Sequence, residues 1–513
     1  MYGVNPFGNP DGARADINEI NEMFITNAPY AVSFTVFPEH LLNMRVIVGA
    51  KGSGKTVYLR KIQDMLRDKA DNIRTGIYVD EHIDQDINCT EKVIAFCDCF
   101  PANVLSEKWT QLWKITLWIT LALKYIHDLQ LQHYVSAEDK KSMQEILERQ
   151  KMMFKSSISA YEVFKALLMH MSSAYDVNSR IDNLDWLELK PLLEKVLRTS
   201  PVIYIFLDAI DVEYEHAPMH WTTCQKGLFY AVMGMLQERV WGERYHILIS
   251  LRNNVFASIL RSEHATKFSE ESHIFFLNWD YANIRYFIVE KIRKLDDCYF
   301  IKPCKRHKDI SSWLGIENIA VSNSSSEPLL DYIVKHTRFV PRDAIILCNN
   351  LAKMHRIVSD DSGIDIQKKI KEFVKECSKS FGDELLTICA KNINANQTPN
   401  GSGRYEYSEN FTANNVYHEG SYHRLKMALS MIKADRITYE ELLKIENKVD
   451  GQLKITSNLS DVLWQNGAIG YLDDDGIERY FTQKADMDSL IPKGKKKYIL
   501  KTCVADALSI NDN

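Results

Sequence analysis

One octapeptide constrains the fold of this chain more than any other segment. Residues 49–56 read G-A-K-G-S-G-K-T and match the pattern G-x-x-x-x-G-K-[S/T] at every position. The run before it, residues 44–48, is apolar and rich in β-branched side chains, which is typical of a buried parallel strand. Residues 57–66 then carry apolar side chains at helical spacing. A strand, a glycine-rich loop and a helix in this order predict a parallel α/β sheet with an anion site at the loop.

The residue types in this loop suit a nucleoside triphosphate. Glycine lets the backbone turn closely around phosphate groups and direct successive N–H groups at their oxygens. Lys55 is placed to reach the β- and γ-phosphates, and the Thr56 hydroxyl is placed to bind Mg²⁺. The alternative is a glycine-rich turn that binds nothing. We therefore expect ATP and Mg²⁺ as ligands, with the nucleotide held by Gly49, Ala50, Lys51, Gly52, Ser53, Gly54, Lys55, Thr56 and Val57.

A second apolar strand ends in a carboxylate. Residues 201–208 read P-V-I-Y-I-F-L-D, and open parallel sheets bind ligands at the carboxyl ends of their strands. We expect Asp208 to hold Mg²⁺ through a water molecule. Ala209 follows where many P-loop ATPases carry a glutamate that polarises the attacking water. Asp211 is the nearest substitute and Glu213 lies two residues further on, although either one could be an ordinary surface acid.

Arginine residues follow two later elements. Arg252 comes directly after the strand pattern of residues 246–251, where a polar side chain can lie between neighbouring strand ends and sense the γ-phosphate. Arg338 and Arg342 lie near the predicted helix 344–354, which Pro341 introduces. Arg342 is the candidate sensor of the nucleotide, with Arg338 as a second possibility. The alternative for all three is a surface or ion-paired arginine.

The totals exclude several functional classes. The 513 residues are 45% hydrophobic and 26% charged, as in a globular protein with a large core, and this length suggests about three domains. A formal net charge of −5 provides no overall basic field for nucleic acid or anionic membranes. The most apolar stretch, residues 112–126, contains two lysines and is too short to span a bilayer. The N-terminus lacks an apolar leader, and the ten cysteines lack paired zinc spacing, so we expect a cytoplasmic protein with reduced thiols and no membrane segment.

The remaining patterns give a domain plan. Further strands are predicted at residues 73–80 and 273–277, with a helix at 281–294. A helical stretch at about 90–200 carries a tryptophan-rich stripe, which we interpret as a buried helix rather than a base-stacking surface. We predict a doubly wound parallel α/β core over residues 1–300 with this helical insertion, followed by a helical lid (301–390) and a linker (391–420).

Residues 421–513 form the last predicted domain. Helices at 422–432, 439–445 and 459–464 and two strands at 468–472 and 477–481 are arranged as in a winged helix-turn-helix. The third helix contains no lysine or arginine, and the turn between the strands carries three aspartates. Both features favour a protein partner or an intramolecular role over DNA, although the lysine-rich run at 493–497 is evidence for nucleic acid.

With these pieces in order, the chain resembles the STAND/AAA+ superfamily of P-loop ATPases, which includes NACHT-type and KAP-type members. The resemblance covers residues 1–360 and extends to the arrangement of the C-terminal helices and strands. It is carried by residues 49–56, by Leu207-Asp208-Ala209-Ile210-Asp211 and by Ser250-Leu251-Arg252. Pro341-Arg342-Asp343 is similar to a motif that ends the ATPase region of bacterial relatives.

The resemblance implies a switch that binds and hydrolyses ATP and assembles with protein partners according to its nucleotide state. Bacterial relatives often serve in anti-phage defence. Two departures stand out: a long insertion separates Lys55 from Asp208, and Ala209 replaces the usual glutamate, which favours slow hydrolysis. Two other functions remain open, namely a DNA-dependent ATPase like the origin-recognition and transposition loaders, and a nucleotide-binding scaffold with little turnover.

Overall fold

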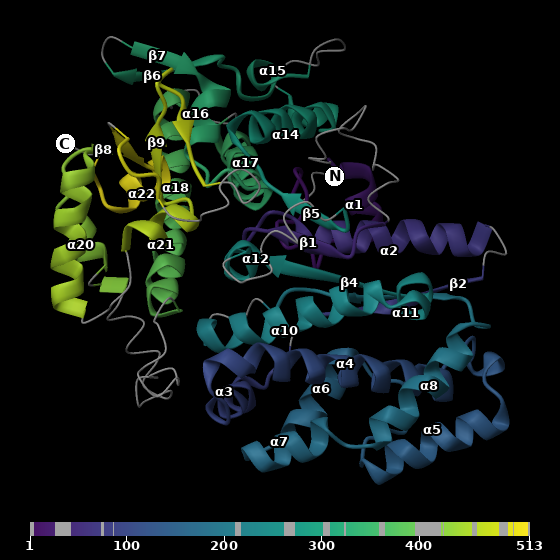
Figure 1. Cartoon of the computed structure of the whole chain (residues 1–513). Coiled ribbons are helices and arrows are strands. Elements are labelled where there is room, and N and C mark those ends of the chain that lie inside the picture. The colour runs from purple at the N-terminus through teal and green to yellow at the C-terminus, as the bar shows by residue number, and fades with distance from the viewer. Residues whose placement is uncertain are drawn as a thin grey trace.

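A five-stranded parallel sheet forms the centre of the molecule (Figure 1). The computed structural model describes residues 5–25, 43–72, 76–85, 87–210, 217–260, 272–300, 308–322, 325–358, 365–395, 422–423, 425–453, 459–481, 491–495 and 497–510. The strand order is β2-β3-β4-β1-β5, and all neighbouring strands run parallel. The strands are β1 (Val46–Gly49), β2 (Ile77–Asp84), β3 (Val202–Leu207), β4 (Tyr245–Arg252) and β5 (Ile274–Leu277). The predicted parallel α/β class is confirmed, and all five carboxyl ends lie at one edge of the sheet.

Helices cover both faces of the sheet because successive strand residues point to opposite sides. Ile47 packs in the core that also holds Leu59 and Ile62 of α2 (Lys55–Asn72), with α1 (Ile17–Met23) beside it. Val46 and Val48 belong to the core on the other face. That second face is covered by α10 (Pro218–Gln237), α11 (Arg239–Arg244) and α12 (Asn253–Leu260).

The predicted boundaries of the second strand are wrong. We expected it at 73–80, whereas β2 runs from Ile77 to Asp84. A register irregularity lies between Val79 and Ile83, after which the strand continues to pair with β3. Because β2 is an edge strand with one neighbour, its second half tolerates the polar run Asp80-Glu81-His82 and lacks the apolar pattern of a buried strand.

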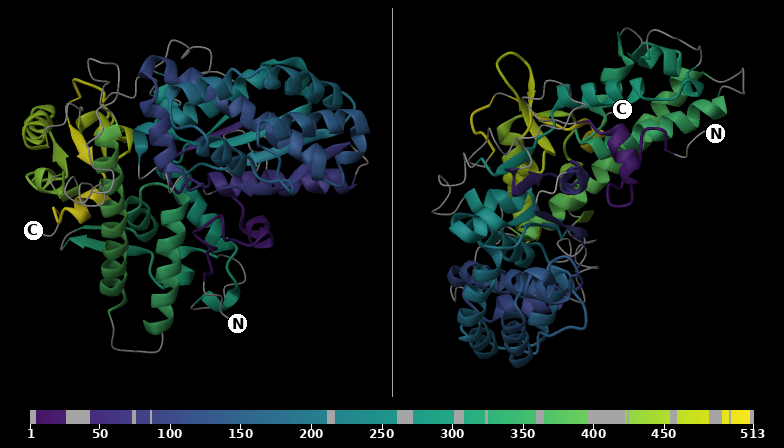
Figure 2. Two further views of the ribbon diagram at one scale, coloured as in Figure 1. Left: turned by 90° about the horizontal axis from the view of Figure 1, so that it is seen from below. Right: turned by 90° about the vertical axis from the view of Figure 1, so that its right-hand side faces the viewer.

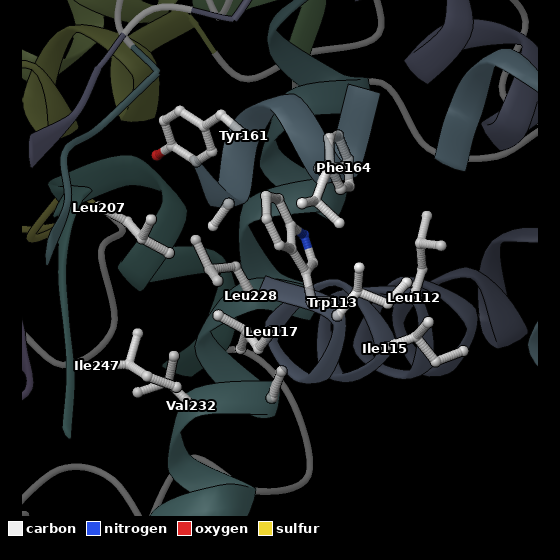
Figure 3. Close-up of a cluster of buried hydrophobic side chains, with 14 of the residues drawn as sticks. Leu112, Trp113, Ile115, Leu117, Tyr161, Phe164, Leu207, Leu228, Val232 and Ile247 are labelled. Carbon is white, nitrogen blue, oxygen red and sulfur yellow. The ribbon is translucent and has the colours of Figure 1, made fainter. Parts of the chain in front are cut away.

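The helical insertion lies between β2 and β3. Its helices are α3 (Thr90–Asp98), α4 (Ala102–His127), α5 (Ala137–Arg149), α6 (Ala160–Met169), α7 (Ala174–Ile181) and α8 (Asp185–Leu197), with a 3₁₀ turn at Gln132–Tyr134. The tryptophan-rich stripe of α4 is buried, as predicted. Trp113 stacks on Phe164 with ring centroids 4.0 Å apart and donates a hydrogen bond to the Cys224 carbonyl of α10 (Figure 3). The insertion is therefore one hydrophobic core with the adjacent face of the sheet.

The segment that follows the sheet is mostly helical, and it includes the predicted lid at residues 301–390. It consists of α14 (Tyr281–Arg293), a 3₁₀ turn (Asp297–Tyr299), α15 (Ile310–Leu314), the hairpin β6 (Asn318–Ser322) and β7 (Ser325–Pro328), α16 (Leu329–Lys335), α17 (Pro341–Val358) and α18 (Ile366–Ala395). The hairpin was not predicted, because its polar residues resemble a loop. None of the helices in the described part of the chain is both long and apolar enough to cross a bilayer.

The C-terminal region packs on the lid, as the two views of Figure 2 show. Its four antiparallel strands are ordered β10-β9-β11-β8. The elements are β8 (Arg436–Ile437), α20 (Tyr439–Leu453), α21 (Leu459–Gln465), β9 (Ile469–Leu472), β10 (Glu478–Arg479), β11 (Tyr498–Leu500) and α22 (Thr502–Ala507). We did not predict β11, which follows the lysine-rich run and lies between β9 and β8. The predicted linker falls mainly on residues 396–421, which lie outside the described ranges.

Candidate nucleotide-binding site

The glycine-rich loop joins β1 to α2 at the carboxyl edge of the sheet. Gly52 and Gly54 adopt φ values of 84° and 98°, in the left-handed region that glycine tolerates best. A Cβ atom on Gly49 would lie 2.4 Å from Ser53 Oγ, so the loop could not close as tightly around another residue. The helix begins at Lys55, two residues before the predicted start, and its first N–H groups have no partner inside the helix. The loop therefore has the backbone of an anion site.

Lys55 is buried beneath this loop. Its ammonium donates hydrogen bonds to the carbonyl oxygens of Gly49 and Ala50, at 3.2 Å each. These contacts hold the positive charge at the mouth of the loop, where phosphate oxygens would meet it.

Asp208 lies beside the start of α2, as predicted. Thr56 Oγ1 donates to Asp208 Oδ2 at 2.5 Å, and Ser250 Oγ donates to Asp208 Oδ1 at 2.5 Å. The Ala209 N–H also donates to Oδ1, at 2.8 Å. Because β4 lies between β1 and β3, Ser250 reaches the carboxylate from the neighbouring strand. The role of Ser250 was missed, and its only signal in the sequence is a hydroxyl residue within an apolar strand.

The same oxygens fit a magnesium ion. Mg²⁺ prefers carboxylate, hydroxyl and water oxygens, and P-loop proteins bind it through a Ser or Thr of the loop and a strand-end aspartate. Thr56 and Asp208 supply this pair of oxygens at the predicted position. Asp208 is 7% exposed and both of its oxygens accept hydrogen bonds, so its orientation is fixed by the protein.

The predicted arginines differ in what they contact. Arg252 is the buried last residue of β4 and pairs with Gly49 of β1, so it lies at the same strand edge. The Arg342 N–H donates to the Gly52 carbonyl at 3.3 Å, and its side chain packs over that glycine. The structure thus brings both residues to the loop. Arg338 is instead an ion-paired arginine, and its partners are Asp343 and Glu384.

Lys51 points towards the lid rather than into the loop. Its ammonium lies 3.3 Å from Glu384 of α18, and Glu384 also pairs with Arg338 at 2.9 Å. Arg338 in turn binds the fully buried Asp343 at 2.6 Å. The Lys51 side chain is therefore engaged by a carboxylate of α18, while its backbone N–H belongs to the loop. These charges connect the loop to α17 and α18.

Asp211, with Glu213, lies outside the described residues.

A cavity adjoins the loop on the side of the N-terminal segment, and we call it the side pocket. It lies between residues 8–25, the start of α2, α14 and α17, and its empty volume of about 560 Å³ includes space that is open to solvent. Asn349 of α17 clamps the N-terminal segment by accepting from Phe7 N–H and donating to the Gly8 carbonyl, at 3.0 Å each. Arg60 of α2 binds the Gly12 and Ala15 carbonyls. Mostly apolar groups line the pocket, among them Ile20, Phe24, Gly54, Tyr58, Trp279 and Pro341. A concave apolar site with few polar groups is typical of small-ligand pockets.

A second carboxylate reaches the same strand edge from β2. The Asp208 N–H donates to the Asp84 carbonyl at 2.8 Å, and Asp84 Oδ2 accepts from the Tyr161 N–H at 3.2 Å. The Tyr161 hydroxyl donates to the Asp208 carbonyl, so α6 of the insertion joins the two acids. Burial raises the pKa of Asp84 to about 6. We missed Asp84 because the end of β2 was predicted too early.

In the described part of the C-terminal region, helix α21 carries no lysine or arginine that could contact DNA bases. In α21, Leu459 to Trp464 are all buried, and Asp461 accepts from the Ile491 N–H. At the turn between β9 and β10, Arg479 pairs with Asp473 at 2.9 Å.

Comparisons with models of protein families, with curated proteins and with solved structures find no match to this chain.

Proposed function

We propose that this chain is an ATP-binding and slowly hydrolysing switch ATPase of the STAND/AAA+ kind. The observation that carries the proposal is the meeting of Thr56 and Asp208 beside the glycine-rich loop that covers Lys55. Two segments that are far apart in the chain contribute groups to one place, and each group has the chemistry that a magnesium triphosphate requires. The strand order supports the same proposal, because β4 separates the loop strand from the aspartate strand and supplies Ser250 and Arg252.

Each group has a role in this proposal. The loop N–H groups and the start of α2 bind the β- and γ-phosphates, with Lys55 adding a positive charge. Thr56 and Asp208 hold Mg²⁺, which when bound neutralises the charge that develops on the phosphates. Ser250 holds the Asp208 carboxylate in position. The side pocket receives the base, since it begins at Gly54 and Tyr58, directly beside the loop.

Turnover is expected to be slow. Ala209 has no carboxylate to polarise water, and its N–H is already engaged by Asp208 and Ser250. We propose Asp211 as the group that activates water, as its position after Asp208 suggests. Arg252 and Arg342 would stabilise the charge on the γ-phosphate from the two sides of the loop.

The contacts between loop and lid support a switch. Gly52 is bonded to Arg342, and Lys51 is paired with Glu384 of α18, which packs along α22 of the C-terminal region. A shift of the loop on phosphate binding would therefore disturb contacts of the lid and, through α18, of the C-terminal region. We propose that this coupling controls assembly with copies of the chain or with protein partners. A role in anti-phage defence is part of the proposal and rests on the family resemblance.

The decisive experiment compares Lys55→Ala with the wild-type chain. Titration calorimetry with ATP and Mg²⁺ should show micromolar-class binding to wild type and a loss of at least about 100-fold in Lys55→Ala, since a charge-assisted contact to phosphate is removed. Lys353→Ala, an exposed lysine of α17, is the matched control and should bind normally. Near-normal affinity of Lys55→Ala would refute the site. Mass measurement with and without a non-hydrolysable ATP analogue tests the assembly.

Ala209 also favours a second function, a nucleotide-binding scaffold with little turnover. Single-turnover hydrolysis separates the two functions, because a switch ATPase releases one phosphate per site whereas a scaffold releases none. A DNA-dependent ATPase would instead shift labelled DNA in a salt-dependent gel assay and hydrolyse ATP faster with DNA present.

A further inference from the structure

Helix α14 carries a buried amine to the wall of the side pocket. Lys291 is 5% exposed, and its Nζ lies 5.4 Å from the centre of the Phe287 ring. No carboxylate of the described residues lies within ion-pair distance of this Nζ, and no hydrogen-bond acceptor is found for it among them. Burial and the nearby Lys294 lower the pKa of Lys291 to about 7. The burial of an amine without an ion partner destabilises the fold, and groups of this kind are common at functional sites.

A carboxylate also lines the side pocket, near this amine. Glu19 belongs to α1, and its Oε1 accepts from the Asn9 N–H at 2.6 Å. A Cβ atom on Gly8 would lie 3.3 Å from Glu19 Oε1 and 3.5 Å from Lys291 Nζ. Gly8 has φ +100° and is held by Asn349, so this position stays without a side chain and leaves the two head groups a common space.

We propose that Lys291 and Glu19 determine which base the nucleotide carries, and that the base is adenine. This inference rests on the proposed function, because it needs the phosphates to lie in the adjoining loop. Lys291 donates to a ring nitrogen of adenine, and the exocyclic amino group of adenine donates to Glu19. The flat ring lies against the apolar lining provided by Ile20, Phe24 and Tyr58.

The use of one Glu19 oxygen favours adenine over guanine. Guanine presents two adjacent donors, N1–H and the 2-amino group, which suit both oxygens of one carboxylate. Oε1 already accepts the Asn9 N–H with one of its lone pairs, so the second oxygen is the freer acceptor for an amino donor. Lys291 supplies donors and no acceptor when charged, so it demands an unprotonated ring nitrogen or a carbonyl on the base.

The test is a titration series of four ligands against wild type, Glu19→Gln and Lys291→Met. The ligands are ATP, GTP, purine riboside triphosphate, which lacks the amino group, and inorganic tripolyphosphate, which lacks a base. Lys291→Met preserves length in an apolar site and removes a buried charge, so it should fold. Lys226→Met, a partly buried lysine of α10 far from the pocket in the chain, is the matched control.

The expected result separates base recognition from phosphate binding. Lys291→Met should weaken ATP by about tenfold to a hundredfold, the range for one charge-assisted hydrogen bond, while tripolyphosphate binds as in wild type. Wild type should prefer ATP to purine riboside triphosphate, and Glu19→Gln should lose most of that preference. An unchanged ratio of ATP to tripolyphosphate affinity in Lys291→Met overturns the inference. A wild-type preference for GTP that depends on these two residues overturns the choice of adenine. If tripolyphosphate did not bind to wild type, this result would instead count against the proposed function.

Discussion

Thr56 Oγ1 lies 2.5 Å from Asp208 Oδ2, although 152 residues separate them in the chain. The contact depends on the strand order: β4 lies between the strands that precede the two residues, and its Ser250 holds the other oxygen of Asp208. The helical insertion contributes as well, because Tyr161 binds the Asp208 carbonyl. The position of this hydroxyl and carboxylate is thus set by contacts within the protein, which is how sites that bind a metal with a triphosphate are preorganised.

The first prediction concerns this pair. In Asp208→Asn, an amide replaces the oxygens that accept from Thr56, Ser250 and the Ala209 N–H. We expect the variant to keep metal-free ATP binding within about threefold and to lose the strengthening that Mg²⁺ gives wild type, with hydrolysis at least about 100-fold slower. Calorimetry with and without Mg²⁺ measures this. An unchanged response to Mg²⁺ would place the metal elsewhere.

A second prediction addresses the group that activates water. Asp211→Asn should bind ATP as wild type does and should lower the single-turnover rate by about 100-fold, since general-base catalysis contributes rate and little ground-state affinity. Quenched-flow measurement of phosphate release gives the rate, and Glu213→Gln is the control two residues away. Equal rates for Asp211→Asn and wild type would assign the base to another acid, with Asp84 as the first candidate because it adjoins Asp208.

Local chemistry explains why part of the site could be predicted. The loop at 49–56 and the strand ending at Asp208 are recognisable because the residue types and their order within a few positions follow from what phosphate and Mg²⁺ need. Arg252 could be placed at the same edge because parallel strands share their carboxyl ends. In each case the information lies within one short segment.

Ser250, Asp84 and Lys291 could not be predicted, because their roles come from neighbours that are distant in the chain. The Ser250 hydroxyl meets Asp208 from the neighbouring strand, and Lys291 lines the side pocket together with Gly8 and Glu19 of the N-terminal segment. Among the elements, the predicted bounds of β2 were wrong, and β11 and the hairpin of β6 and β7 were not predicted. These segments carry polar or basic residues within or next to the strands, so hydrophobic periodicity did not mark their limits.

The third prediction is a pH dependence of stability at Asp84. Its pKa is raised from 3.8 to about 6, chiefly by burial, so the folded protein holds a proton there more tightly than the unfolded chain. The charged carboxylate destabilises the fold above about pH 6, and this cost disappears as the pH falls towards 4. Asp84→Asn should therefore raise the free energy of unfolding by about 1–2 kcal/mol near pH 8, with its amide oxygen still accepting from Tyr161. Thermal unfolding at several pH values measures the difference.

The control for this experiment is Asp64→Asn, an acid of α2 that accepts a hydrogen bond from Asn21. Its effect on stability gives the baseline for replacing a carboxylate with an amide in this protein. If the advantage of Asp84→Asn persisted unchanged at about pH 4.5, relief of a buried charge could not be its cause.

The last prediction tests how the C-terminal region is held on the lid. Gly382 of α18 packs directly on α22, and a Cβ atom there would lie 1.9 Å from the Cys503 carbonyl oxygen. Gly382→Ala must push the two helices apart, so we expect it to lower the free energy of unfolding by about 1–3 kcal/mol or more, despite the helix-favouring effect of alanine. Gly234→Ala on α10 is the matched control, because its Cβ would meet only the flexible end of Lys114 at 3.5 Å. There the propensity gain should dominate and stabilise by about 0.5–1 kcal/mol. Thermal melts of the two variants decide the matter: equal stabilisation by both would mean that α18 and α22 are not in contact at this glycine.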